Sequence, residues 1–96
     1  DPTIDSLVCA TDTMAIGAMT YLKEIGLRIP EDVQVAGIGD GALGKIMEPK
    51  LTTVHFYYKT SGREAAAMLV DLLERDKGVC KEVKMSCELV ERETNR

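Results

Sequence analysis

The 96-residue sequence predicts an α/β fold built from βαβ units with a parallel sheet. Two short apolar runs, at 4–10 and 33–38, enclose a segment whose apolar positions repeat with helical spacing. A strand, a helix and a second strand in this order favour a right-handed parallel crossover. In such a sheet the carboxyl ends of the strands meet at one edge, where these folds bind their ligands. Residues 12–40 therefore predict both an architecture and the position of a site.

The first helix has sequence signals at both of its ends. Thr11 or Asp12 can cap it, because either side chain can accept a hydrogen bond from a backbone N–H of the first turn. Gly26 predicts the end of the helix, since glycine adopts a left-handed conformation at little cost, and Pro30 prevents continuation. We expect the helix to pack through one apolar stripe made of Met14, Ala15, Ala18, Met19, Leu22 and Ile25.

The second strand of this unit is followed by a short helical turn and a third strand. The run 33–38 is almost wholly apolar, which is typical of a strand covered on both faces. One helical turn is expected over 42–47, before Pro49. The β-branched and aromatic run 51–58 predicts a third strand.

The last third of the chain predicts a second helix and a final strand. Ser61 and Glu64 have the spacing of a capping box, although the helix could also begin earlier, near Lys59. It is expected to end near Gly78. The final strand alternates, and Val90 breaks its phase, which suggests a bulge. Its inward side chains are expected to be Val83, Met85, Cys87 and Leu89.

Composition excludes several classes of function for this chain. Its net charge is −4, with Lys and Arg scattered, so it lacks the basic surface that nucleic acids and anionic membranes require. No run suits a transmembrane helix. Cys9 is expected to be a buried thiol, and Cys80 and Cys87 lack metal-ligand spacing. We therefore expect no metal and no cofactor, and a reducing cytoplasm as the compartment.

Polar residues next to the two strand ends are the candidate ligand contacts. Asp40 could accept hydrogen bonds from a polyol, or it could cap the turn that follows it. Thr11 could cap the helix, contact a ligand, or do both. The glycines of 37–41 do not form a dinucleotide fingerprint, because no long helix begins after them. His55 could be a general base, but an ordinary strand histidine is the simpler interpretation, so no enzymatic reaction is indicated.

Four motifs then occur in order: DTMAIGA at 12–18, GLRIPEDV at 26–33, GIGD at 37–40 and PKLTTV at 49–54. Together they resemble the C-terminal part of the effector-binding domain of the LacI/GalR repressor family. The resemblance implies a fragment of a periplasmic-binding-protein-like, Rossmann-like domain, in which two α/β lobes are hinged around a small ligand. Residues 1–96 would comprise a βαβ portion of the second lobe (1–54), a hinge crossing with a helix that packs on the first lobe (55–84), and a return strand with the C-terminal tail (85–96).

The resemblance also implies roles for individual residues. The expected ligand contacts are Thr11, Gly39, Asp40, Phe56 and Tyr58. Gly39 stands where many members of the family place a sugar-binding aspartate, so Asp40 could substitute for it, or the ligand could differ. Ile16, Met19 and Met47 match positions that resemble the family's subunit interface, with plain core packing as the alternative.

The function implied is the effector-binding and dimerisation portion of a transcriptional repressor. The effector would be a sugar or sugar phosphate, the protein a homodimer, and operator DNA would be bound only through an N-terminal helix-turn-helix domain that this chain lacks. A sugar-binding protein of a transporter is the first alternative, and a small α/β enzyme is the second.

Overall fold

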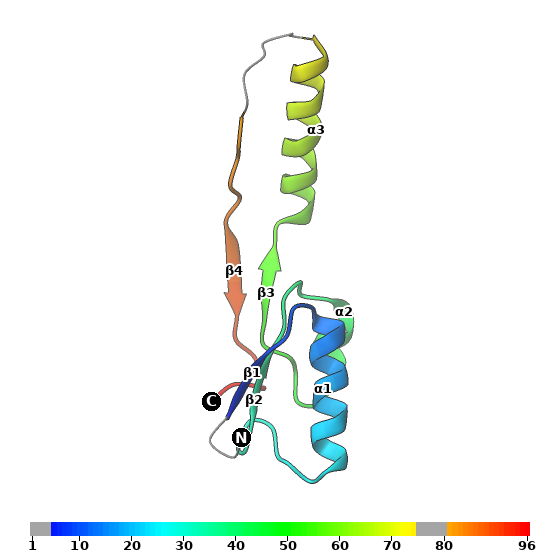
Figure 1. The fold of residues 1–96 in the computed structure, drawn as a ribbon, viewed down its shortest axis with the longest axis vertical. Coiled ribbons are helices and arrows are strands. Elements are labelled where there is room, and N and C mark those ends of the chain that lie inside the picture. Colours follow the sequence, from blue (N-terminus) through cyan, green and yellow to red (C-terminus); the bar gives the residue numbers. More distant parts are fainter. Residues whose placement is uncertain (1–4, 75–80) are drawn as a thin grey trace. The chain divides into compact units, whose positions relative to one another are not determined.

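The computed structural model describes residues 5–74 and 81–96. These residues form the elements β1 (Ser6–Val8), α1 (Asp12–Glu24), β2 (Gln34–Ala36), α2 (Ala42–Ile46), β3 (Thr53–Phe56), α3 (Tyr58–Glu74) and β4 (Cys87–Val90) (Figure 1). The chain divides into two compact units. The first unit runs to His55 and resumes at Glu88, and the second runs from Phe56 to Cys87. The divisions expected from the family resemblance lie close to these, at 54/55 and 84/85.

The first unit contains the predicted parallel βαβ arrangement. β1 pairs in parallel with β2, with Leu7 opposite Val35, and α1 connects the two strands (Figure 1). At the end of β2, a parallel bridge joins Ala36 to Thr52, and the Gly37 N–H donates to the Thr52 carbonyl at 3.0 Å. β3 pairs with β4 in a second two-stranded sheet. The α/β fold class is therefore confirmed.

Both ends of α1 form as predicted. The Thr11 hydroxyl accepts a hydrogen bond from the Met14 N–H at 3.2 Å, so Thr11 is the N-cap and Asp12 is the first helical residue. At the other end Gly26 has a φ of 84°, which favours glycine, and the Leu27 N–H donates to the Leu22 carbonyl at 2.9 Å. This bond satisfies a carbonyl that the end of the helix would otherwise leave without a partner.

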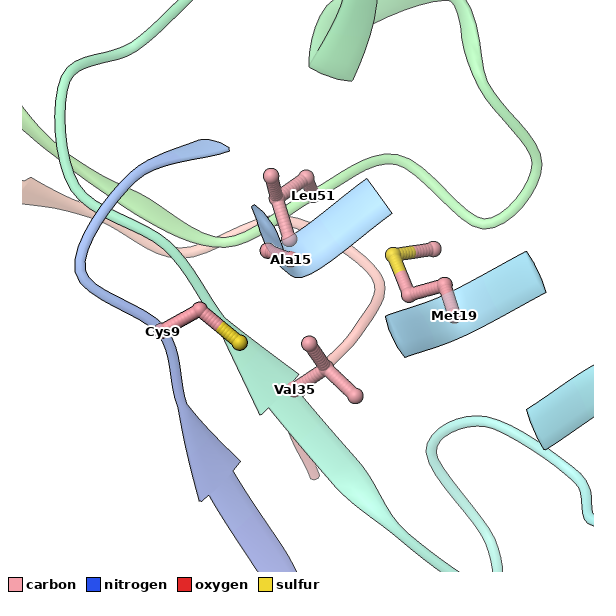
Figure 2. Close-up of a cluster of buried hydrophobic side chains, with 5 residues drawn as sticks. All are labelled: Cys9, Ala15, Met19, Val35 and Leu51. Carbon is pink, nitrogen blue, oxygen red and sulfur yellow. The ribbon is translucent and has the colours of Figure 1, made fainter. Parts of the chain in front are cut away.

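The core of the first unit consists of Cys9, Ala15, Met19, Val35 and Leu51 (Figure 2). α1, β2 and the segment before β3 all contribute to it. The predicted stripe of α1 is wrong at its edges, because Met14 and Ile25 are 58% and 52% exposed. Ile16 packs against the core instead. Helical spacing located the stripe, but the position of β2 and Leu51 determines which flank of it is covered.

The C-terminal segment completes the first unit. Thr94 is fully buried, and its hydroxyl donates to the Val35 carbonyl at 2.6 Å and accepts from the Thr52 N–H at 2.8 Å. The Val35 N–H in turn donates to the Thr94 carbonyl at 3.0 Å. A single threonine thus connects β2 to the segment that leads into β3.

The second unit differs from the prediction at the start of its helix. α3 begins at Tyr58, and the Ser61 N–H already donates to the Tyr57 carbonyl at 2.8 Å. The capping box at Ser61 is therefore wrong and the earlier start is right. No residue of α3 is buried. The predicted end near Gly78 lies outside the described residues.

The final strand is shorter than predicted. β4 begins only at Cys87, and Val90, where the alternation breaks, is its last residue. Val83, Met85 and Leu89 are 38%, 41% and 63% exposed, so the expected inward face is not buried. Alternation predicts which side chains share a face, but a buried face also needs a partner to pack against. Within residues 5–74 and 81–96, none of the helices has the length and apolar character that a membrane crossing needs.

Candidate functional site

Asp12 organises the edge of the sheet at the start of α1. Its side chain is buried, one carboxylate oxygen accepts from the Thr53 hydroxyl at 2.6 Å, and the other accepts from the Gly41 N–H at 2.7 Å. These bonds join the start of α1, the loop before α2 and the start of β3. Gly37 also belongs to this contact, because a Cβ atom there would collide with Asp12 Oδ1 and lie 3.1 Å from Asp12 Cα.

Thr11 lies at this edge with an exposed side chain. Its hydroxyl oxygen accepts the capping bond from Met14, while the hydroxyl hydrogen can still be donated elsewhere. Capping and ligand contact are therefore compatible at Thr11. The capping function is confirmed, and the ligand contact stays a prediction.

The loop after β2 has an unusual backbone conformation. Gly39 has a φ of 128° and Asp40 a φ of 56°. The Gly39 N–H donates to the Val54 carbonyl at 2.8 Å, and the Asp40 N–H donates to the Thr53 hydroxyl at 3.2 Å. A side chain at residue 39 would be strained, because L-residues rarely adopt such a φ. The conformation therefore explains the glycine at this position.

The carboxylate of Asp40 is surrounded by two basic side chains and a histidine. Oδ1 accepts from Arg92 Nη2 at 2.7 Å, and Oδ2 lies 2.9 Å from His55 Nδ1 and 3.9 Å from Lys45 Nζ. The side chain of Asp40 is only 7% exposed. Asp40, Lys45, His55 and Arg92 are hereafter called the Asp40 cluster. All four belong to the first unit.

Two opposing effects act on the pKa of Asp40. Burial favours the neutral acid and raises the pKa, whereas the hydrogen bond and charge of Arg92, the charge of Lys45 and the hydrogen bond with His55 lower it. The cationic partners outweigh burial, so the pKa of Asp40 lies below its ordinary value. Asp40 is thus a paired carboxylate in the folded protein.

These contacts change the interpretation of two predicted residues. Gly41 is the N-cap of α2 and no side chain caps that helix, so the idea that Asp40 caps the following turn is wrong. His55 has an acidic partner, which sequence reasoning missed. Arg92 was missed as well. Its separation from Asp40 by 52 residues left no local signal.

Phe56 and Tyr58, the other expected ligand contacts, belong to the second unit. Their rings form an edge-to-face pair with centroids 6.0 Å apart and an interplanar angle of 78°. Phe56 is 38% exposed and Tyr58 60% exposed. Both rings therefore present apolar surface, and their contact with a ligand stays a prediction.

The expected subunit contacts divide into two groups. Met19 is fully buried in the core, so its side chain cannot reach a partner, and core packing explains it. Ile16 and Met47 are partly buried and pack against the same core. The apolar side chains that are exposed on α1 and α2 are instead Met14, Tyr21, Leu43 and Ile46.

Among the described residues, no group of three His, Cys, Asp or Glu side chains could hold a metal ion. Cys9 is a buried free thiol, as predicted, and Cys87 is an exposed one. Cys80 lies outside the described residues.

The family follows from a match over nearly the whole chain. A model of the periplasmic binding protein-like domain matches residues 1–95. The chain belongs to this family. Over 92 residues it is 40% identical to the HTH-type transcriptional repressor PurR of Vibrio vulnificus, an alignment that covers 93% of this chain and 27% of PurR. The chain thus spans about a quarter of the length of this curated relative.

Solved structures of transcriptional regulators support the same assignment. The transcriptional regulator CelR in complex with cellobiose aligns with a TM-score of 0.90 and 32% identity, covering 98% of this chain and 29% of CelR. The Lac repressor dimer bound to operator and the anti-inducer ONPF aligns with a TM-score of 0.85 and 30% identity, covering 94% of this chain and 31% of that one. The predicted resemblance to the LacI/GalR family, as a fragment of its effector domain, is confirmed.

Proposed function

We propose that this chain forms part of the effector-binding domain of a LacI-type transcriptional repressor. The observation that carries the proposal is the alignment of almost the whole chain with the CelR–cellobiose complex, at a TM-score of 0.90. The effector would be a sugar or sugar phosphate, whose binding shifts the equilibrium between forms of different affinity for DNA. Operator binding would require a helix-turn-helix domain outside this chain, and the site of action would be the cytoplasm.

The exposed Thr11 hydroxyl supports a ligand contact at the carboxyl edge of the sheet. This hydroxyl can donate to a sugar oxygen while it caps α1. Gly39 would contribute its backbone, since it has no side chain. For Phe56 and Tyr58 the proposal rests on the family resemblance and on their exposed aromatic faces, which suit the apolar faces of a sugar ring.

A homodimer is the proposed assembly. Exposed apolar side chains on α1 and α2 support it, because such groups on a surface commonly mark protein contacts. Ile16 and Met47 would contribute at the margin of this contact, where they are partly buried by their own core. The proposed surface is formed by Met14, Tyr21, Leu43 and Ile46.

A thermal-shift panel tests the effector proposal on the full-length protein that carries this chain. The panel contains common mono- and disaccharides, their phosphates, and purine bases. A ligand that binds the folded form at 100 times its Kd stabilises it by about 2.7 kcal/mol, which gives a clear rise in Tm. A panel in which no sugar or sugar phosphate raises Tm would contradict the proposal, and a response to purines alone would reassign the effector class.

Two substitutions at Thr11 separate its roles. Thr11→Ser keeps a hydroxyl for both the cap and the ligand, whereas Thr11→Gly removes the hydroxyl and is still an acceptable N-cap residue. Affinity for the sugar found in the panel should fall in Thr11→Gly but stay near wild type in Thr11→Ser. Equal affinities in the two variants would exclude the ligand contact.

A further inference from the structure

Two members of the Asp40 cluster stand close in sequence to the points where the chain leaves and re-enters the first unit. The first unit ends at His55 and resumes at Glu88, so His55 is the last residue before one crossing. Arg92 follows the other crossing, just beyond the end of β4. Asp40 binds both side chains, each through a different carboxylate oxygen. One carboxylate from the loop after β2 therefore contacts the segments next to both crossings.

Arg92 is itself fixed by several contacts. Its backbone N–H donates to the Thr52 hydroxyl at 2.9 Å, and its guanidinium Nη1 donates to the Leu51 carbonyl at 2.9 Å. Nη2 is the group that reaches Asp40. With its side chain 17% exposed, the guanidinium is largely withdrawn from solvent, and its removal would leave Asp40 with a reduced set of cationic partners.

The conformation of Asp40 is suited to this inward contact. A φ of 56° is uncommon for a residue with a side chain, but aspartate and asparagine tolerate it better than most residues. The carboxylate is 7% exposed, and each of its oxygens already has a partner. The carboxylate therefore offers little exposed surface to a sugar hydroxyl, and its burial favours the contacts within the protein.

We propose that Asp40 is a positioning residue, which holds the loop at the effector edge against the segments that lead to both crossings, and is not a contact to the effector. The proposal rests on the proposed function for the identity of that edge. In it, the loop after β2, His55 and Arg92 form one connected part of the first unit, held together by the carboxylate of Asp40. In this proposal the loop has no side chain at Gly39, and the carboxylate of the next residue, Asp40, binds other side chains of the protein and not the effector.

Amide hydrogen exchange in the Asp40→Asn variant tests the local part of this proposal. Asparagine keeps the shape and tolerates the backbone conformation, but it removes the charge that pairs with Arg92 and His55. The Gly39 N–H, bonded to Val54, should exchange at least roughly tenfold faster, which corresponds to losing about 1.4 kcal/mol of local stability. The Gly37 N–H, bonded to Thr52 further along the same edge, and the Gly41 N–H, bonded to Asp12, should change less than about threefold.

A double-mutant cycle tests the partnership itself. Asp40→Asn and Arg92→Gln should each raise the unfolding equilibrium constant by roughly ten- to a hundredfold, and the double variant should match the larger single effect instead of multiplying them. Arg92→Lys should fall between wild type and Arg92→Gln because it keeps the charge but loses the planar donors. Asp32→Asn is the matched control, since Asp32 pairs with Arg28 on the surface and should change the constant only slightly.

Each result supports or overturns the proposal. Selective exchange at Gly39 together with a non-additive cycle supports it. Equal acceleration of all three glycine amides, an unchanged Gly39 amide, or multiplicative single effects would overturn it. None of these measurements uses an effector, so the two proposals fail independently. A panel in which no sugar raises Tm contradicts the proposed function and does not decide the role of Asp40. Multiplicative effects in the double-mutant cycle contradict the positioning role of Asp40 and do not decide the proposed function.

Discussion

The two units of this chain bury their apolar residues to very different extents. In the first unit, Met19, Val35 and Leu51 are fully buried and come from three separate segments (Figure 2). In the second unit, α3 has no buried residue, although its sequence carries a helical stripe of apolar side chains. Leu69, Val70, Leu72 and Leu73 of this helix are between 49% and 78% exposed. The first unit therefore contains its own core, whereas the second presents an apolar surface.

Polar contacts add to the stability of the first unit. Asp12, Asp40 and Thr94 each join segments of the first unit that are far apart in the sequence. In the second unit, α3 has no buried residue, whereas helices derive most of their stability in proteins from a packed face. We infer that α3 reaches full stability only when another surface covers its stripe, as the first lobe would in the domain proposed above.

The largest expected contrast comes from truncating one leucine in each unit. Leu51→Ala removes a fully buried side chain that packs against Gly44, and should lower the free energy of unfolding by about 3 kcal/mol. Leu73→Ala, at a residue 78% exposed, should change it by less than about 0.5 kcal/mol. Urea unfolding of the 96-residue chain, followed by circular dichroism, measures both. Similar losses in the two variants would mean that α3 is packed in solution.

A smaller effect is expected from adding one methyl group to the first unit. Gly37→Ala places a Cβ against Asp12 and 3.3 Å from the Cβ of Ala15, and should destabilise the unit by roughly 1–3 kcal/mol. The carboxylate of Asp12 must shift, which weakens its bonds to Thr53 and Gly41. Thermal unfolding should show a lower Tm than wild type. A Tm equal to that of wild type would mean that the edge can relax around the methyl group.

Some parts of this molecule were predictable because their causes are local. Thr11 and Gly26 determine the ends of α1 within a few residues of each end, and the apolar run at 33–38 located β2. The contacts between Asp40 and Arg92, and between Thr94 and Val35, depend on how distant segments meet. Periodicity cannot determine such pairings. For the same reason, helical periodicity assigned Met14 and Met19 to the same packed stripe of α1, although only Met19 is buried.

Acid should affect the first unit through Asp40. Because its pKa in the folded protein is lowered, the charged form stabilises the fold fully above the ordinary value of 3.8, and this contribution is lost as the pH falls through the lowered folded pKa. Below pH 3.8, Asp40→Asn should reduce the slope of the unfolding free energy against pH by up to about 1.4 kcal/mol per pH unit. Urea unfolding at several pH values between neutral and strongly acidic measures this slope. A variant with the wild-type slope would show that other carboxylates account for the acid sensitivity.

The smallest effect is a stabilisation, and it belongs to the second unit. Gly62 lies inside α3, and a Cβ added there would meet nothing within 4 Å. Gly62→Ala should therefore stabilise the helix by roughly 0.5–1 kcal/mol, because alanine restricts the unfolded chain and favours helical conformation. Slower amide exchange confined to α3 is the expected readout. Gly17→Ala, in the open middle of α1, is the matched control and should slow exchange in the first unit instead. If Gly62→Ala slowed exchange equally in both units, the two would unfold as one cooperative body. The units would then differ in how much apolar surface they bury but not in their stability.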